Sequence, residues 1–164
     1  MQSLKSINVL ILINVATIFT ISILGRGLQN FFFSVINKDQ FYIVIAISFI
    51  FGFISLGVLL RSKITNSNSF FLRVSFCILI MLISQSYIVR PEEKLHLLLF
   101  SFLGFLISFF HKVRFGLTVG LLVSFGDEVL QYFVPNRFFG WDDVMINLYA
   151  AYVTFFILKY KSKQ

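Results

Sequence analysis

Two acidic residues, Asp127 and Glu128, lie near the end of an otherwise apolar run, and Gln131 follows them. In a helix, Asp127 and Gln131 share one face because they are four residues apart, and Glu128 lies about 100° round from Asp127. A carboxylate in apolar surroundings needs a cation, a proton or a hydrogen-bond donor. A pair of such carboxylates can act as a general acid or base, or it can orient a bound polar ligand.

Two further segments bring similar groups to the start of an apolar run. Each segment opens with a pair of acids and has a histidine or an asparagine about one helical turn later. The residues are Glu92, Glu93 and His96 in one segment, and Asp142, Asp143 and Asn147 in the other. Arg90 and Arg137 stand in the adjoining connections. Their planar guanidinium groups are suited to paired hydrogen bonds with phosphate or carboxylate.

These residues define a candidate site with two kinds of role. An imidazole beside a carboxylate can transfer protons, which gives the site its catalytic candidates. The candidate catalytic residues are Asp127, Glu128 and His96. The candidate ligand-binding residues are Arg90, Glu93, Gln131, Arg137, Asp143 and Asn147.

Structural explanations stand beside these functional ones. An acid in the first turn of a helix stabilises it by a few tenths of a kcal/mol through the helix dipole. As an alternative to function, this explains the four acids Glu92, Glu93, Asp142 and Asp143 as signals of a helix start. The same explanation fails for Asp127 and Glu128, which lie late in their run. A structural clasp between these acids and Arg137 explains them as well as a functional role does. His96 can likewise be an interhelical histidine with no catalytic part.

The composition places these groups in a membrane protein. The chain of 164 residues is 58% hydrophobic and 13% charged, and its mean hydropathy is +0.89; lipid-embedded chains have such values, whereas soluble domains do not. Its 23 Phe residues follow no single helical stripe, which favours lipid-facing side chains over an aromatic cofactor site. The net charge of +7 comes from basic residues that flank apolar runs, which is a topology signal and disfavours nucleic-acid binding.

Six apolar runs predict an all-α bundle of six transmembrane helices. The runs cover about residues 7–25, 41–60, 70–89, 95–110, 114–133 and 144–158. Because about 20 helical residues cross the hydrocarbon, the fourth and sixth runs are slightly short. They reach full length only if Glu93, Lys94 and His96, or Asp143 and Asn147, belong to their helices. We therefore expect these polar residues to face protein or a wet cavity.

The basic residues predict the orientation of the bundle. With six spans, both termini and the second and fourth connections share one side, which carries nine Lys and Arg residues. The other side carries five, together with all seven acids. The positive-inside rule places the more basic side in the cytoplasm. We expect a multi-pass protein of the cytoplasmic membrane, with both termini inside and the acids outside.

Shorter features refine this arrangement. Residues 28–37 are apolar, uncharged and interrupted by Asn, which predicts a short interfacial helix. Pro91 fits the first turn of the fourth span, and Pro135 ends the fifth. Gly52 and Gly104 each stand four residues from a serine, a spacing that permits close helix packing.

Several kinds of chemistry are disfavoured. Cys77 is the only cysteine, so the chain can form no intrachain disulfide and has no CxxC metal motif. It also lacks a paired-His zinc motif and a G-x-S-x-G nucleophile motif. We expect no metal and no cofactor, and we expect membrane lipids as partners.

Residues 126–147, G-D-E-V-L-Q-Y-F-V-P-N-R-F-F-G-W-D-D-V-M-I-N, resemble the C-terminal signature of the VanZ-like membrane proteins. That pattern is roughly D-E-x-x-Q-x-x-x-P-x-R-x-x-x-x-x-D-x-x-x-N. The matching residues are Asp127, Glu128, Gln131, Pro135, Arg137, Asp143 and Asn147. Residues 92–104, E-E-K-L-H-L-L-L-F-S-F-L-G, resemble the acidic start, the histidine and the Leu-Gly of the family further upstream.

The resemblance covers about residues 70–158, so the first two spans lie outside it. We therefore divide the chain into residues 1–69, with two spans, the interfacial segment and a cytoplasmic loop, and residues 70–164, a VanZ-like four-helix domain with a basic tail. Leu99 and Phe100 stand where the family often has Glu-Tyr, and Ala150 stands where it usually has Gly.

The family is named for a member linked to resistance to the glycopeptide teicoplanin, so the resemblance implies a bacterial inner-membrane protein that acts at the envelope. Our first hypothesis is a binding protein whose outward-facing pocket takes a lipid-linked saccharide, a lipid headgroup or a glycopeptide. The second is a membrane hydrolase or transferase that acts on a lipid-linked or cell-wall substrate in the same pocket. A small proton-coupled transporter is a third, disfavoured because carriers place polar groups near the midplane and all the acids here lie at one end.

Overall fold

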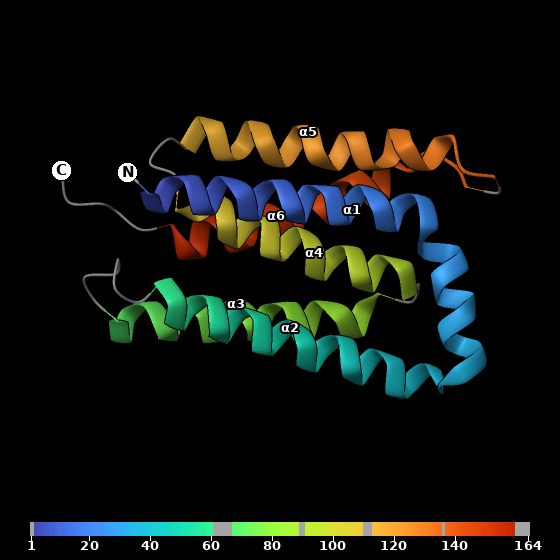
Figure 1. Ribbon diagram of the computed structural model, residues 1–164, viewed down its shortest axis with the longest axis horizontal. Helices are drawn as coiled ribbons and strands as arrows, with labels where there is room; N and C mark the ends of the chain where they lie inside the picture. The colour runs from blue at the N-terminus through green and yellow to red at the C-terminus, as the bar shows by residue number, and fades with distance from the viewer. Residues whose placement is uncertain (1, 61–66, 89–90, 110–112, 136, 160–164) are drawn as a thin grey trace.

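The computed structural model describes residues 2–60, 67–88, 91–109, 113–135 and 137–159. All secondary structure in these residues is helical, which confirms the all-α prediction. The helices lie side by side in a bundle (Figure 1). They are α1 (Gln2–Val35), α2 (Lys38–Leu60), α3 (Ser67–Tyr87), α4 (Pro91–Ser108), α5 (Val113–Tyr132) and α6 (Trp141–Leu158).

Successive helices run in alternating directions, so the connections divide between the two ends of the bundle. The α1–α2 and α5–α6 connections lie at one end, where α4 also begins, and the start of α1 and the end of α6 lie at the other (Figure 1). We call the first of these the acidic end. The acids of the described connections and helix ends gathered there are Asp39, Asp127, Glu128, Asp142 and Asp143.

The first helix is longer than the hydrocarbon requires. Figure 1 shows its C-terminal part turning away from the bundle axis and running across the acidic end toward α2. The segment 28–35 therefore continues α1, where we expected a separate short helix. It carries no proline to end the helix earlier. Asn37 then separates the two helices, because its side-chain oxygen accepts the backbone N–H of Asp39 at 3.2 Å in the first turn of α2.

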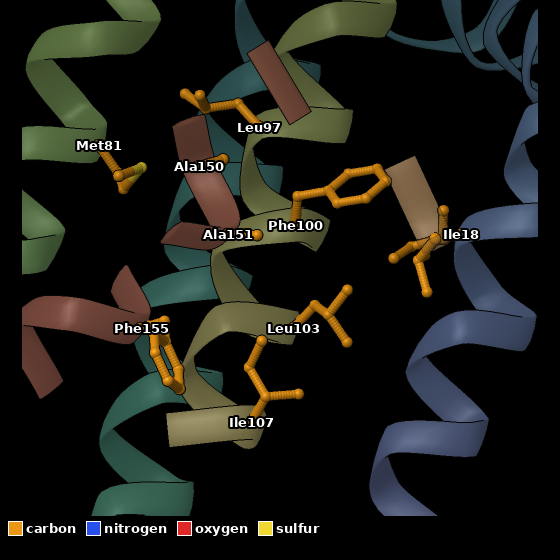
Figure 2. Packing of buried hydrophobic residues seen from close by; sticks show 10 residues of the cluster. Ile18, Met81, Leu97, Phe100, Leu103, Ile107, Ala150, Ala151 and Phe155 are labelled. Atoms are coloured by element: carbon orange, nitrogen blue, oxygen red, sulfur yellow. The ribbon is translucent and has the colours of Figure 1, made fainter. Parts of the chain in front are cut away.

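The fourth helix is the centre of the bundle. It contacts each of the other five helices, most extensively α6, and none of its described large apolar side chains is exposed. Figure 2 shows Phe100 and Leu103 of α4 directed toward α1, with the ring of Phe100 close to Ile18. All three residues belong to the main buried apolar cluster. His96, one turn before Phe100 on the same helix, is also buried.

Glycines permit the close packing of α4, α5 and α6. A Cβ atom added at Gly104 of α4 would lie 2.1 Å from the backbone oxygen of Ala151 on α6. On α5, an added Cβ at Gly120 would lie 2.7 Å from the ring of Tyr152. The hydroxyl of Tyr152 donates to the carbonyl of Leu117 at 2.7 Å, which holds α6 against the backbone of α5. The predicted close approach at Gly104 is confirmed.

The helices around α4 expose large apolar side chains on their outer faces. A water-soluble monomer rarely exposes so much contiguous apolar surface, whereas lipid solvates it without cost. Examples, one from each outer helix, are Leu12, Phe51, Leu72, Leu122 and Phe156. By length and composition alone, one stretch of the described residues, Ile7–Gly25, is sufficient to cross a membrane, and shorter apolar stretches lie in α2, α3 and α4.

The helix boundaries bear on the candidate residues. Pro91 is the first residue of α4, and α5 ends three residues before Pro135, as the sequence predicts. His96 lies inside α4, and Asn147 lies inside α6. Both polar residues are buried, so they face protein as expected.

Candidate functional site

The carboxylate of Asp127 is the centre of a buried polar network at the acidic end. Its side chain has no solvent exposure. Oδ1 accepts a hydrogen bond from the hydroxyl of Ser22 on α1. Oδ2 accepts from Gln131 Nε2 at 3.1 Å and from Asn147 Nδ2 at 3.2 Å. His96 Nε2 lies 3.2 Å from the same oxygen, an ion pair when the imidazole is protonated. One carboxylate thus links α1, α4, α5 and α6.

The second carboxylate, Glu128, is equally buried and faces the α5–α6 connection. Its Oε1 accepts from Gln131 Nε2 at 3.0 Å, and its Oε2 accepts from the backbone N–H of Gly140 at 3.1 Å. The two N–H groups of the Gln131 amide therefore bridge both carboxylates. The Gln131 amide thus supplies the donors that two neighbouring acids would otherwise take from a cation.

Gly140 brings the start of α6 against this network. It is the N-cap residue of α6. A Cβ atom added to it would lie 2.9 Å from Asp143 Oδ2, so glycine leaves the space that the Asp143 carboxylate occupies. Asp142 and Asp143 stand in the first turn of α6, where the helix dipole stabilises negative charge.

The pattern of α5 explains why its acids point inward. Its buried side chains recur every three or four residues and end with the polar group of Asp127, Glu128 and Gln131. After Tyr132 the chain turns through backbone bonds from Val134 N to Gln131 O and from Arg137 N to Val134 O, at 3.0 and 3.1 Å. This turn returns the chain over the buried acids.

Arg137 lies in that turn and is half-buried. Its Nη1 donates to the backbone carbonyl of Ser22 at 3.2 Å. We expected Arg137 to pair with Asp127 or Glu128, with Arg90 as the second candidate. The Arg137 pairing is wrong: the two carboxylates accept from Ser22, Gln131, Asn147 and the N–H of Gly140 instead. The guanidinium group has five N–H donors. Within the described part of the chain, one hydrogen bond occupies it.

The structure brings most of the candidate residues together at the acidic end. His96, Asp127, Glu128, Gln131 and Asn147 form the buried network. Arg137 and Asp143 lie beside it, partly exposed. Arg90 lies outside the described residues, as does the side chain of Glu93. In the described segments, no group of three or more His, Cys, Asp or Glu side chains forms a metal-binding arrangement.

Two members of the network were missed by the sequence reasoning. Ser22 supplies both its hydroxyl and its carbonyl from the first helix. The sequence does contain a signal for Ser22. Asn14, Ile18 and Ser22 are spaced by four residues, so they form one face of α1, which is buried and partly polar. Gly140 acts through a backbone N–H, which no side-chain pattern reveals.

These features define a class of protein. An all-helical bundle with a buried polar network, apolar outer faces and a long apolar first helix is typical of helical membrane proteins. The comparisons with known families agree with this class. A model of the VanZ/LLP1 family matches residues 5–162, and the chain belongs to this family. Membership and the apolar helix together indicate a membrane protein of the VanZ type.

The family match also covers α1 and α2, which we expected to lie outside the resemblance. The division of the chain at residue 69 stays a prediction. Neither the curated proteins nor the solved structures gave a match.

Proposed function

We propose that this chain is a six-span protein of the bacterial cytoplasmic membrane that binds an anionic ligand at its acidic end, outside the cell. The distribution of basic residues supports this orientation, with both termini in the cytoplasm. The observation that carries the binding role is Arg137, a partly exposed guanidinium held by one hydrogen bond to a backbone carbonyl.

The buried network acts as a framework in this proposal. Asp127 and Glu128 have no exposed surface, so a ligand meets neither without a rearrangement. Ser22 connects the framework to the contact residue, because its hydroxyl bonds Asp127 and its carbonyl accepts from Arg137. The network therefore fixes the direction of the guanidinium group before the ligand arrives, which reduces the entropy lost on binding.

The ligand combines an anionic group with hydroxyls. Arg137 takes a phosphate or carboxylate, for which its planar donors are well suited. Asp143 is partly exposed at the start of α6 and accepts hydrogen bonds from sugar hydroxyls. Lipid-linked saccharides, phospholipid headgroups and glycopeptides all have this chemistry.

Replacing Arg137 with alanine tests the proposal. We expect Arg137→Ala to weaken binding about tenfold or more, because a hydrogen bond to a charged group contributes about 1.5–3 kcal/mol. The measurement is affinity in nanodiscs for three probes: a polyprenyl diphosphate saccharide, phosphatidylglycerol and teicoplanin. Arg114→Ala, which removes an exposed arginine at the opposite end, serves as the matched control. Equal losses in the two variants, or no loss in either, would refute the role of Arg137.

As a second proposal, the chain is a membrane hydrolase or transferase that acts on its substrate at the acidic end. His96 Nε2 lies 3.2 Å from Asp127 Oδ2, an arrangement in which a carboxylate can orient an imidazole for proton transfer. If the variants Asp127→Asn and His96→Ala keep their ligand affinity and lose turnover of a lipid-linked substrate, the enzyme proposal replaces the binding one.

A further inference from the structure

Three aromatic side chains pack together at the acidic end beside Arg137. Phe125 lies 5.7 Å from Phe139 and 6.3 Å from Trp141, and Phe139 lies 5.0 Å from Trp141, measured between ring centroids. We call these three residues the aromatic cluster. Phe125 is 45% exposed and Trp141 is 66% exposed, so the cluster presents a surface to its surroundings.

The cluster is tied to the polar network through its backbone. Gly140 separates Phe139 from Trp141, and its N–H donates to the buried Glu128 carboxylate at 3.1 Å. Arg137 precedes Phe139 by two residues, so their Cα atoms lie within about 7 Å of each other. The charged donor and two of the three rings therefore stand on one short segment of chain, which the Gly140 bond ties to α5.

In the membrane orientation proposed above, the cluster lies near the boundary between the headgroups and the hydrocarbon. Trp141 is the first residue of α6 at the acidic end, whereas Phe125 lies on α5 two turns before that helix ends at Tyr132. An occupant of this surface therefore extends from the level of polar headgroups toward the hydrocarbon. Phosphate complements the charge of Arg137, and a hydrocarbon chain complements the three rings.

We propose that the aromatic cluster binds the hydrocarbon chain of a phosphate-bearing lipid whose phosphate is bound by Arg137. This inference rests on the proposed function and selects among its ligands. A lipid phosphate or a lipid-linked saccharide has both parts in the required order. A glycopeptide without an acyl chain has only the polar part.

The test compares two probes that share a diphosphate and differ in the chain, inorganic diphosphate and farnesyl diphosphate. In wild-type protein in nanodiscs, we expect farnesyl diphosphate to bind about tenfold tighter or more. The variant Phe125→Ala/Trp141→Ala should lose most of this preference and keep its affinity for inorganic diphosphate. The milder variant Phe125→Leu/Trp141→Leu keeps apolar side chains at the surface and should lose part of the preference.

A second aromatic pair provides the matched control. Tyr132, the last residue of α5, and Phe133 after it are exposed, with ring centroids 5.6 Å apart, and neither flanks Gly140. The variant Tyr132→Ala/Phe133→Ala should keep the preference for the farnesyl chain. Unchanged elution on size exclusion shows that each variant is folded.

Three results would overturn the inference. If the cluster variant and the control variant lose the preference for farnesyl diphosphate equally, the rings are general membrane anchors. Arg137-dependent binding of inorganic diphosphate, with no preference for the farnesyl probe, would refute the chain site and leave the proposed function standing. Failure of wild-type protein to bind either probe would refute phosphate binding at Arg137 as well.

Discussion

Replacing Asp127 with leucine should lower the free energy of unfolding by about 3–5 kcal/mol, because several buried donors lose their acceptor at once and each unsatisfied group costs about 1–3 kcal/mol. Leucine branches at Cγ as aspartate does, but it is larger and accepts no hydrogen bond. The substitution leaves the donors of Ser22, Gln131, Asn147 and His96 facing an apolar side chain in the bundle interior. Denaturant titration of the purified protein in mixed micelles measures the loss.

Two comparisons show whether the loss comes from the network. Asp142→Ala removes an exposed acid from the first turn of α6 and should cost only a few tenths of a kcal/mol. In a double-mutant cycle, Ser22→Ala should cost much less in the Asp127→Leu background than in wild type, because their shared contact is already lost. Thr17→Ala removes a different hydroxyl of α1, which donates to the carbonyl of Ile13, and this variant should show no such coupling. Additive effects for Ser22 would refute the network.

Replacing Gly104 with alanine should destabilise the bundle by about 1–3 kcal/mol or more, although only one methyl group is added. The new Cβ would meet three backbone atoms of Ala151, the nearest at 2.1 Å. Backbone atoms cannot rotate aside, so α4 and α6 must separate along their whole contact. The melting temperature in detergent is a sufficient measurement.

Gly52 supplies the matched control for this prediction. An added Cβ at Gly52 meets no atom within 4 Å, so Gly52→Ala should leave stability unchanged or raise it by up to about 1 kcal/mol through helix propensity. Similar losses at both glycines would show that α4 and α6 are not packed as described.

Much of this structure could be predicted from the amino-acid sequence, because lipid imposes strong rules. Apolar runs in a membrane chain must be helical, since no other open structure satisfies backbone hydrogen bonds in hydrocarbon. The inward face of α5 followed from the spacing of Asp127, Glu128 and Gln131. The position of Asn147 inside the sixth helix followed from the length needed to span the bilayer.

The partners of the buried acids could not be predicted in the same way. Charge alone suggested Arg137, but three neutral donors and an imidazole surround Asp127 in its place. Neutral donors carry no charge signature in a sequence, and the N–H of Gly140 carries no side-chain signature at all. The contribution of Ser22 depends on how α1 packs against α5, which local patterns do not specify.

The arrangement explains how a chain this apolar keeps two acids inside a membrane bundle. Asp127 and Glu128 share the amide of Gln131, and each adds donors from other elements. Ser22 ties the network to α1, Asn147 ties it to α6, and the N–H of Gly140 ties it to the α5–α6 connection. In our proposal this stability is used to hold Arg137 and the aromatic cluster in place at the surface.

The most direct test of the account is the side of the membrane on which the acidic end lies. In a Cys77→Ala background, cysteines at the exposed positions Asp142→Cys and Arg114→Cys mark the two ends of the bundle. A membrane-impermeant maleimide should label Asp142→Cys in intact cells and should label Arg114→Cys only after permeabilisation. The reverse pattern would put Arg137 and its framework in the cytoplasm and contradict the proposed role.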